Sequence, residues 1–165
     1  MNSRATTSQA CLLLGSNIAP EQNLPKAIAL LCRYVEVART SRVWETPAVG
    51  SAGANFLNVA VLVRTHLKAE QLKNQVLSAI EADLGRVRTA DKFASRPIDI
   101  DIIAWDCQVT DPNVWQFAHV AVPVSEVLLC DVHSDSGESL AQAAARLRHT
   151  TSIRLHGRLS PALTQ

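Results

Sequence analysis

The chain has 165 residues, of which 47% are hydrophobic, and a formal net charge of +1. This length and composition predict a single globular domain over residues 1–165 that can bury its own core. A charge near zero gives no long-range attraction to nucleic acid or to an anionic membrane, and the apolar runs are too short to span a bilayer. Residues 1–10 lack the apolar stretch of a secretory signal, and we expect them to form a flexible tail.

The four cysteines are far apart in the sequence and form no CxxC pair: Cys11, Cys32, Cys107 and Cys130. Each lies in apolar sequence, so we interpret each one as a small core residue of a protein in a reducing compartment. The predicted location is therefore the cytoplasm, and we expect a monomer.

The first part of the chain alternates between strand and helix patterns. The apolar run at 11–14 stops at the loop "GSN", which predicts a strand followed by a turn. Leu24, Ile28 and Leu31 recur at helical spacing, with Pro25 tolerated in the first turn. The segment "VEVARTSRVW" predicts a second strand. Residues 45–55 are rich in Gly, Ala, Pro and Ser, so they predict a mobile loop.

The next segments complete a recognisable order. "FLNVAVLVRT" predicts a third strand, which is apolar on both faces and therefore central. Leu72, Val76, Ile80 and Leu84 predict a second helix that Gly85 ends, and "IDIDIIAW" predicts a fourth strand after a basic loop. The order β-α-β-β-α-β is typical of ferredoxin-like α+β sandwiches. A C-terminal extension follows, with a helix predicted over 138–149 and no clean periodicity over 114–129.

Two acidic residues interrupt the fourth predicted strand. Asp99 and Asp101 lie two residues apart, so they share one face of the strand, whereas Ile98, Ile100 and Ile102 point to the other. No residue of opposite charge stands beside them on the strand, and a divalent cation such as Mg²⁺ would relieve their mutual repulsion. Two such ions about 3.5–4 Å apart would fit between these side chains. The alternative is an exposed strand face with solvated carboxylates.

A basic loop precedes the acidic strand. Arg86, Arg88, Lys92 and Arg96 cluster there, opposed only by Asp91. Arginine forks match phosphate oxygens, and positive charge beside a metal site favours a polyphosphate substrate. Metal carboxylates combined with arginines indicate phosphoryl transfer, and the chain contains no GxxxxGK[ST] loop of the P-loop enzymes. The alternative for this loop is a salt-bridged surface segment.

Four sequence blocks together resemble a known family. "LLLGSN", "ETPAVG" followed by "FLN", "IEADLGRVR" and "RPIDIDI" occur in the order and spacing of the 6-hydroxymethyl-7,8-dihydropterin pyrophosphokinases. The resemblance covers about residues 11 to 106. It implies a ferredoxin-like fold and transfer of pyrophosphate from ATP to the hydroxymethyl group of the pterin, which releases AMP in folate biosynthesis.

The resemblance also implies a role for individual residues. Asp99 and Asp101 correspond to the ligands of two Mg²⁺ ions, and with Arg86 and Arg96 they form the catalytic set. ATP is expected to contact Glu81, Arg88, Lys92 and Arg96. The pterin is expected to contact Thr46, Pro47, Val49, Phe56, Asn58, Phe93 and His119. Phe93 stands where the family usually has tryptophan.

One stretch departs from the family pattern. After the fourth strand the family usually carries a Pro-His-Pro-Arg-like block and a further arginine, but residues 108–120 contain neither arginine nor that histidine. His119 takes the place of a stacking aromatic residue, and its alternative is an ordinary strand histidine. This departure leaves open a degenerate paralogue that binds pterin or nucleotide without turnover. A ferredoxin-like RNA-binding domain is disfavoured, because the strands lack the aromatic pairs on which bases stack.

Overall fold

The computed structural model describes residues 6–50, 52–130 and 132–159. Seven strands form one antiparallel sheet in the order β6-β5-β1-β4-β3-β7, with β2 also paired to β4. The strands are β1 (Ser8–Ser16), β2 (Glu36–Thr40), β3 (Val43–Thr46), β4 (Phe56–Thr65), β5 (Asp99–Trp105), β6 (Gln108–Val109) and β7 (Arg154–Gly157). The helices are α1 (Pro20–Leu31), α2 (Ala69–Gln71), η1 (Leu72–Leu77), α3 (Ser78–Asp83), η2 (Pro112–Trp115), α4 (Ala118–Val127) and α5 (Leu140–Thr150).

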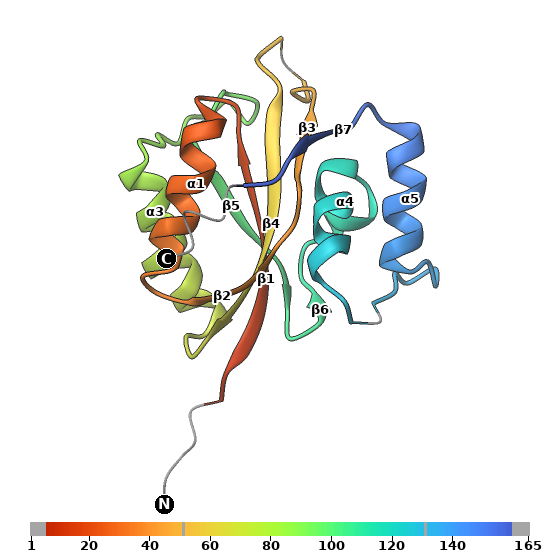
Figure 1. The fold of residues 1–165 in the computed structure, drawn as a ribbon, viewed down its shortest axis with the longest axis horizontal. Helices are drawn as coiled ribbons and strands as arrows, with labels where there is room; N and C mark the ends of the chain where they lie inside the picture. The colour runs from red at the N-terminus through yellow and green to blue at the C-terminus, as the bar shows by residue number, and fades with distance from the viewer. Residues whose placement is uncertain (1–5, 51, 131, 160–165) are drawn as a thin grey trace, which may run out of the picture.

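Helices cover both faces of the sheet. Figure 1 shows α1 and α3 on one face and α4 with α5 on the other. Alternate residues of the central strand β1 serve the two sides, because Leu12 and Leu14 belong to the core under α1 while Leu13 belongs to the core under α4. The predicted β-α-β-β-α-β order and the ferredoxin-like α+β fold are therefore confirmed, with strands β2 and β3 sharing the second strand segment.

The second predicted helix is continuous but not uniform. Its middle third, η1, is a π-helical segment between α2 and α3. The helix ends at Gly85 as predicted, and this glycine has a φ of +89°. The N–H of Gly85 bonds to the carbonyl of Ala82, and the N–H of Arg86 bonds to the carbonyl of Glu81. This pair of bonds is a Schellman motif, and it brings Arg86 back over the last turn of the helix.

Two sequence-based interpretations are wrong in detail. β1 begins at Ser8, so residues 8–10 belong to the sheet and not to a tail. His119 lies in the first turn of helix α4, not in a strand. The periodicity of this segment is hidden because α4 packs between the sheet and α5 and is buried nearly all round.

The cysteine interpretation also needs correction. Cys107, in the turn between β5 and β6, forms a disulfide with Cys130 after α4, with their Cα atoms 6.1 Å apart. Cys32 is exposed, and only Cys11 is a buried free thiol. Burial raises the pKa of Cys11 to about 12, so that thiol is inert. The sequence shows no sign of this disulfide, because Cys107 and Cys130 are far apart in the chain and only the packing of α4 against the sheet brings them together.

Candidate active site

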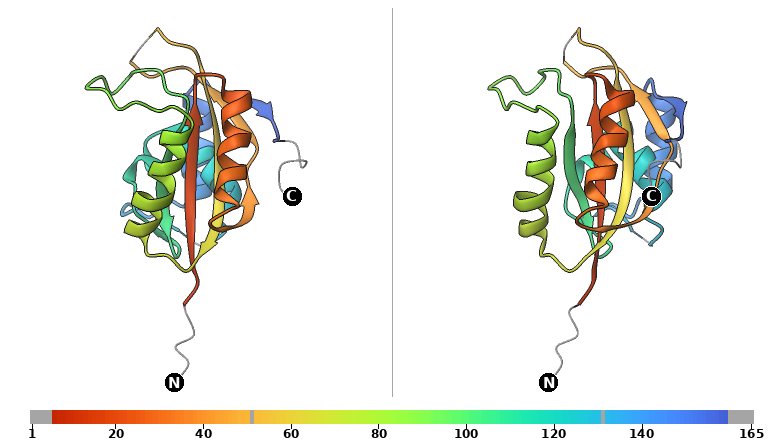
Figure 2. Two further views of the ribbon diagram at one scale, coloured as in Figure 1. Left: turned by 90° about the vertical axis from the view of Figure 1, so that its left-hand side faces the viewer. Right: turned by 60° about the vertical axis from the view of Figure 1, so that its left-hand side comes forward.

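A cavity of about 200 Å³ lies where the strand ends meet two loops, one between β3 and β4 and the other between α3 and β5. Both loops extend from the same end of the sheet, as Figure 2 shows. Every residue predicted to contact the pterin lines this cavity, together with both aspartates and two of the predicted cations. The lining comprises Leu13, Gly15, Thr46, Pro47, Val49, Phe56, Asn58, Lys92, Phe93, Arg96, Asp99, Asp101 and His119. The structure thus brings together residues from β1, β3, β4, β5 and α4.

One end of the cavity presents a fixed amide. Asn58 on β4 is 3% exposed, and its Nδ2 donates to the carbonyl of Trp44 at 3.3 Å and to Thr46 Oγ1 at 3.0 Å. These two acceptors fix the orientation of the amide. A Cβ atom added at Gly15 would lie 3.3 Å from Asn58 Oδ1, so the glycine keeps the space beside that oxygen open. Asn58 therefore offers a hydrogen-bond acceptor to a ligand in the cavity.

Aromatic rings and one close loop contact form the cavity walls. Phe56, Phe93 and His119 all line it. Burial lowers the pKa of His119, with Asp111 and Asp99 acting in the opposite direction, so the imidazole is neutral near pH 7. Gly50 has a φ of +70°, and a Cβ atom there would lie 2.8 Å from the Phe93 ring. The two loops therefore touch each other at the cavity mouth, at a position where any side chain beyond glycine would be strained.

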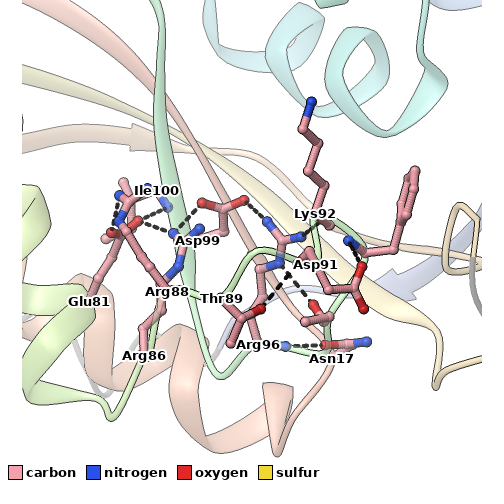
Figure 3. Close-up of polar contacts among 12 residues, drawn as sticks. Asn17, Glu81, Arg86, Arg88, Thr89, Asp91, Lys92, Arg96, Asp99 and Ile100 are labelled. Atoms are coloured by element: carbon pink, nitrogen blue, oxygen red, sulfur yellow. Dashed lines mark hydrogen bonds and ion pairs between the residues drawn. The ribbon is translucent and has the colours of Figure 1, made fainter.

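Asp99 has partners that the sequence did not reveal. Its carboxylate accepts a hydrogen bond from Arg96 Nη1 at 2.7 Å and another from Arg86 Nη1. Figure 3 shows Asp99 between the two guanidinium groups. In the metal-free protein these two arginines of the basic loop offset the charge of Asp99, so the alternative of a salt-bridged loop is present at this residue. Arg96 also lies over the Phe56 ring, 5.9 Å from its centroid, which connects the charged side of the cavity to the aromatic side.

Glu81 holds Arg86 in place beside Asp99. Its side chain is 6% exposed, and Oε1 accepts from Arg86 Nη1 at 2.6 Å and from the backbone N–H of Ile100 at 2.8 Å. The Schellman motif places Arg86 within reach of both acids, as Figure 3 shows. Burial lowers the pKa of Arg86, but the charges and hydrogen bonds of Asp99 and Glu81 outweigh it and leave that pKa above its ordinary value. Arg86 is therefore a permanent cation behind Asp99.

Asp101 has a different electrostatic environment. Asp101 remains accessible to solvent, but desolvation of its carboxyl group by the surrounding cavity walls raises its pKa from 3.8 to about 6. Repulsion from Asp99, Asp111 and Glu81 adds to this effect, and Arg86 opposes it. A carboxylate kept among other acids is stabilised in its ionised form by a bound cation.

Comparison with known proteins places the chain in a family. Residues 11–129 match the family model described as 7,8-dihydro-6-hydroxymethylpterin-pyrophosphokinase (HPPK). The chain belongs to the HPPK family. The 2-amino-4-hydroxy-6-hydroxymethyldihydropteridine pyrophosphokinase of Synechocystis is 33% identical over 140 residues, which cover 78% of the chain and 71% of the relative. The folate synthesis bifunctional protein of Arabidopsis thaliana is 29% identical over 134 residues, which cover 74% of the chain.

The solved structures support the fold. The wild-type HPPK-DHPS of Plasmodium falciparum, crystallised with pteroate, superimposes with a TM-score of 0.66 at 13% identity and covers 86% of the chain. The chain spans 42% of that protein and 28% of the Arabidopsis relative, so both are longer proteins that contain an HPPK-like part.

The donor set of this candidate site suits Mg²⁺ bound together with a substrate. Among the described residues no cluster of three or more His, Cys, Asp or Glu side chains can hold a metal ion. Two carboxylates on one strand face are what Mg²⁺ uses when substrate phosphates supply the remaining oxygens. Asp99 and Asp101 both line the cavity, so they fit this role.

Three residues predicted for the HPPK site lie behind the cavity. Glu81, Arg86 and Arg88 are not part of its lining; Arg88 Nη2 donates to Glu81 Oε2 at 3.3 Å. Arg86 and Arg88 line an adjoining hollow of about 290 Å³, which shares Lys92 and Arg96 with the cavity. The buried Glu81 is occupied by arginines and a backbone N–H, so its predicted contact with ATP remains a prediction.

The departure from the HPPK pattern has a structural counterpart. Residues 108–120 form β6, η2 and the start of α4, and Thr110 and Asp111 line a hollow of about 480 Å³ beside Asp101. Lys73 is the one cation in that lining, against three carboxylates from Glu70, Asp101 and Asp111. This side of the site is therefore acidic where the family usually has a histidine and arginines.

Proposed function

We propose that the chain transfers the pyrophosphoryl group of ATP to the hydroxymethyl group of 6-hydroxymethyl-7,8-dihydropterin and releases AMP, with Mg²⁺ required. The observation that carries this proposal is the single cavity in which a fixed amide, aromatic walls, two carboxylates and Arg96 meet. Membership of the HPPK family supports the reaction class. The volume of about 200 Å³ is below the roughly 300–1,000 Å³ typical of drug-sized ligands, so it suits a small bicyclic ring.

The pterin would lie flat between the aromatic walls. Asn58 Oδ1 would accept a hydrogen bond from an N–H at the ring edge, and the neutral His119 would contact the ring face. The backbone of the segment from Thr46 to Val49 would read the same edge. These contacts orient the hydroxymethyl group toward Asp99 and Asp101, because the acids and the amide line the same cavity.

The phosphates would lie between Asp101 and the basic loop. Bound Mg²⁺ would neutralise the triphosphate and activate the transferred phosphorus, with Asp99 and Asp101 as its protein ligands. Arg96 lies between the acids and Phe56, so its guanidinium would contact the transferring group. Arg88 has a side chain that is 72% exposed and would reach the outer phosphates. Closure of the two loops would exclude water, which otherwise competes with the pterin hydroxyl.

The test is AMP release from ATP that depends on both hydroxymethyl-dihydropterin and Mg²⁺. Asp101→Ala should reduce this activity by several orders of magnitude and leave the circular dichroism spectrum unchanged. Asp83→Ala, which removes an exposed acid at the end of α3, serves as the control and should keep full activity. Near-normal turnover of Asp101→Ala with Mg²⁺ would refute the metal assignment.

A second candidate function rests on the acidic hollow beside Asp101. The three carboxylates in its lining would weaken ATP binding, which favours a protein that binds the pterin without turnover. Two lost charge-assisted hydrogen bonds, at about 1.5–3 kcal/mol each, correspond to roughly a hundredfold or more in affinity. This candidate is selected if calorimetry finds binding of the pterin but not of Mg²⁺-ATP, and if the turnover assay finds no AMP release.

The location and the oligomeric state of the protein are also proposals. None of the described helices is both long and apolar enough to cross a membrane. We propose a monomer that uses small-molecule substrates in the cytoplasm, although the Cys107–Cys130 disulfide is uncommon in that compartment.

A further inference from the structure

Asn17 carries contacts that neither the sequence patterns nor the proposed reaction assigned to it. It follows β1 directly and is 6% exposed. Its Nδ2 donates to the carbonyl of Ala54 at 3.2 Å and to Ser95 Oγ at 3.2 Å, while its Oδ1 accepts from the backbone N–H of Arg96 at 2.8 Å. The backbone N–H of Asn17 donates to the carbonyl of Arg96 at 3.2 Å.

These contacts join the two loops at the cavity. Ala54 belongs to the loop that leads into Phe56, and Ser95 and Arg96 belong to the basic loop; Figure 3 shows Asn17 beneath Arg96. The chemistry fixes the orientation of the amide, since a carbonyl can only accept and a backbone N–H can only donate. The amide supplies donors toward both loops and an acceptor toward the backbone of Arg96.

We propose that Asn17 is a positioning residue that fixes the backbone of Arg96 and couples the two loops to each other. Asn17 binds both the backbone N–H and the backbone carbonyl of Arg96, and the Arg96 guanidinium donates to Asp99 at 2.7 Å and lies over the Phe56 ring. Order in the loop that leads to the pterin side is thereby transmitted to the arginine of the phosphate side. The catalytic consequence rests on the proposed function, whereas the coupling does not.

Two substitutions separate the two halves of the amide. Asn17→Asp keeps an oxygen that accepts from the Arg96 N–H but removes the donors to the Ala54 carbonyl and to Ser95 Oγ. Asn17→Ala removes both. Asn23→Ala is the matched control, because Asn23 lies nearby in α1 and donates to Ile18 at 2.7 Å but bonds to neither loop.

Hydrogen exchange of the ligand-free, metal-free protein decides the matter. One lost hydrogen bond corresponds to about a fivefold change in local opening. We expect Asn17→Asp to raise exchange about fivefold at residues 53–56 and to leave the Arg96 amide protected. We expect Asn17→Ala to raise exchange at both segments, and Asn23→Ala at neither. Unchanged loops in Asn17→Ala, or a uniform rise across the whole sheet, would overturn the proposal.

A second readout tests the catalytic part. In pterin-dependent AMP release, Asn17→Ala should lower kcat at least tenfold, and its effect should nearly vanish in an Arg96→Ala background, because it acts through Arg96. Equal effects in both backgrounds would overturn positioning through Arg96. If the wild-type protein releases no AMP while the exchange pattern holds, the proposed function fails and the coupling by Asn17 stands.

Discussion

Replacing Asp99 by asparagine should lower the free energy of unfolding of the metal-free protein, whereas the same change at Asp101 should not. Asp99 accepts charge-assisted hydrogen bonds from Arg86 and Arg96, with side chains that are 13% and 23% exposed. Such bonds contribute about 1.5–3 kcal/mol each when buried. Asparagine keeps one acceptor oxygen and Arg86 keeps Glu81, so we expect a loss of about 2 kcal/mol.

Asp101 gives the internal comparison. Desolvation and the neighbouring acids raise the pKa of Asp101, so Asp101→Asn should leave the stability unchanged or increase it by up to about 1 kcal/mol. Urea denaturation in the presence of a chelator, with equal m-values, measures both variants. Equal losses in the two variants, or no loss in Asp99→Asn, would refute the view that the arginines replace a metal as counterions of Asp99.

Three further predictions concern the charge on Asp101, the disulfide and the loop contact. Because the pKa of Asp101 rises from 3.8 to about 6 on folding, the folded state binds more protons between these values, and the free energy of unfolding should fall as the pH rises from about 4 to 6. This slope should flatten in Asp101→Asn; a slope that persists in urea titrations would belong to another group. Reduction of Cys107–Cys130, which are 23 residues apart, should lower the free energy of unfolding by about 3 kcal/mol, and an unchanged urea midpoint with reductant would contradict this. Gly50→Ala should strain the loop by about 1–2 kcal/mol and weaken pterin binding roughly tenfold in calorimetry, because the added methyl meets Phe93; wild-type affinity would show that this contact is not used.

The first two-thirds of the fold could be predicted because its signals are local. Hydrophobic periodicity and the glycine at the end of the second helix lie within a few residues of the elements they define. Helix α4 gave no such signal, since it is buried on nearly all sides and its apolar residues show no face. The disulfide was missed for a related reason, because only the packed fold brings its two cysteines together.

The candidate site shows the same division. The pair Asp99 and Asp101 is visible in the sequence because strand geometry places alternate residues on one face. The partnership of Asp99 with Arg86 is not visible, since it depends on how the helix before Gly85 ends. Asn17 was missed because the residues it bonds to are 37 and 78 positions or more away. Asn17 lies in the motif "GSN" of the first sequence block, but the motif does not indicate which residues Asn17 contacts.

The alternation along β5 has a consequence for how the gene tolerates change. Ile98 and Ile100 belong to the core under α1, while their neighbours Asp99 and Asp101 face the cavity. In a saturation scan, neighbouring codons would therefore fail in different ways: the core positions mainly through loss of cellular protein, the cavity positions mainly through loss of activity. The irregular register that β5 shows against β1 past Ile102 reverses this order, because Ile103 and Ala104 both belong to the core under α4. The bulge would appear in the scan as the point along β5 where the alternation between the two phenotypes changes, without any structural measurement.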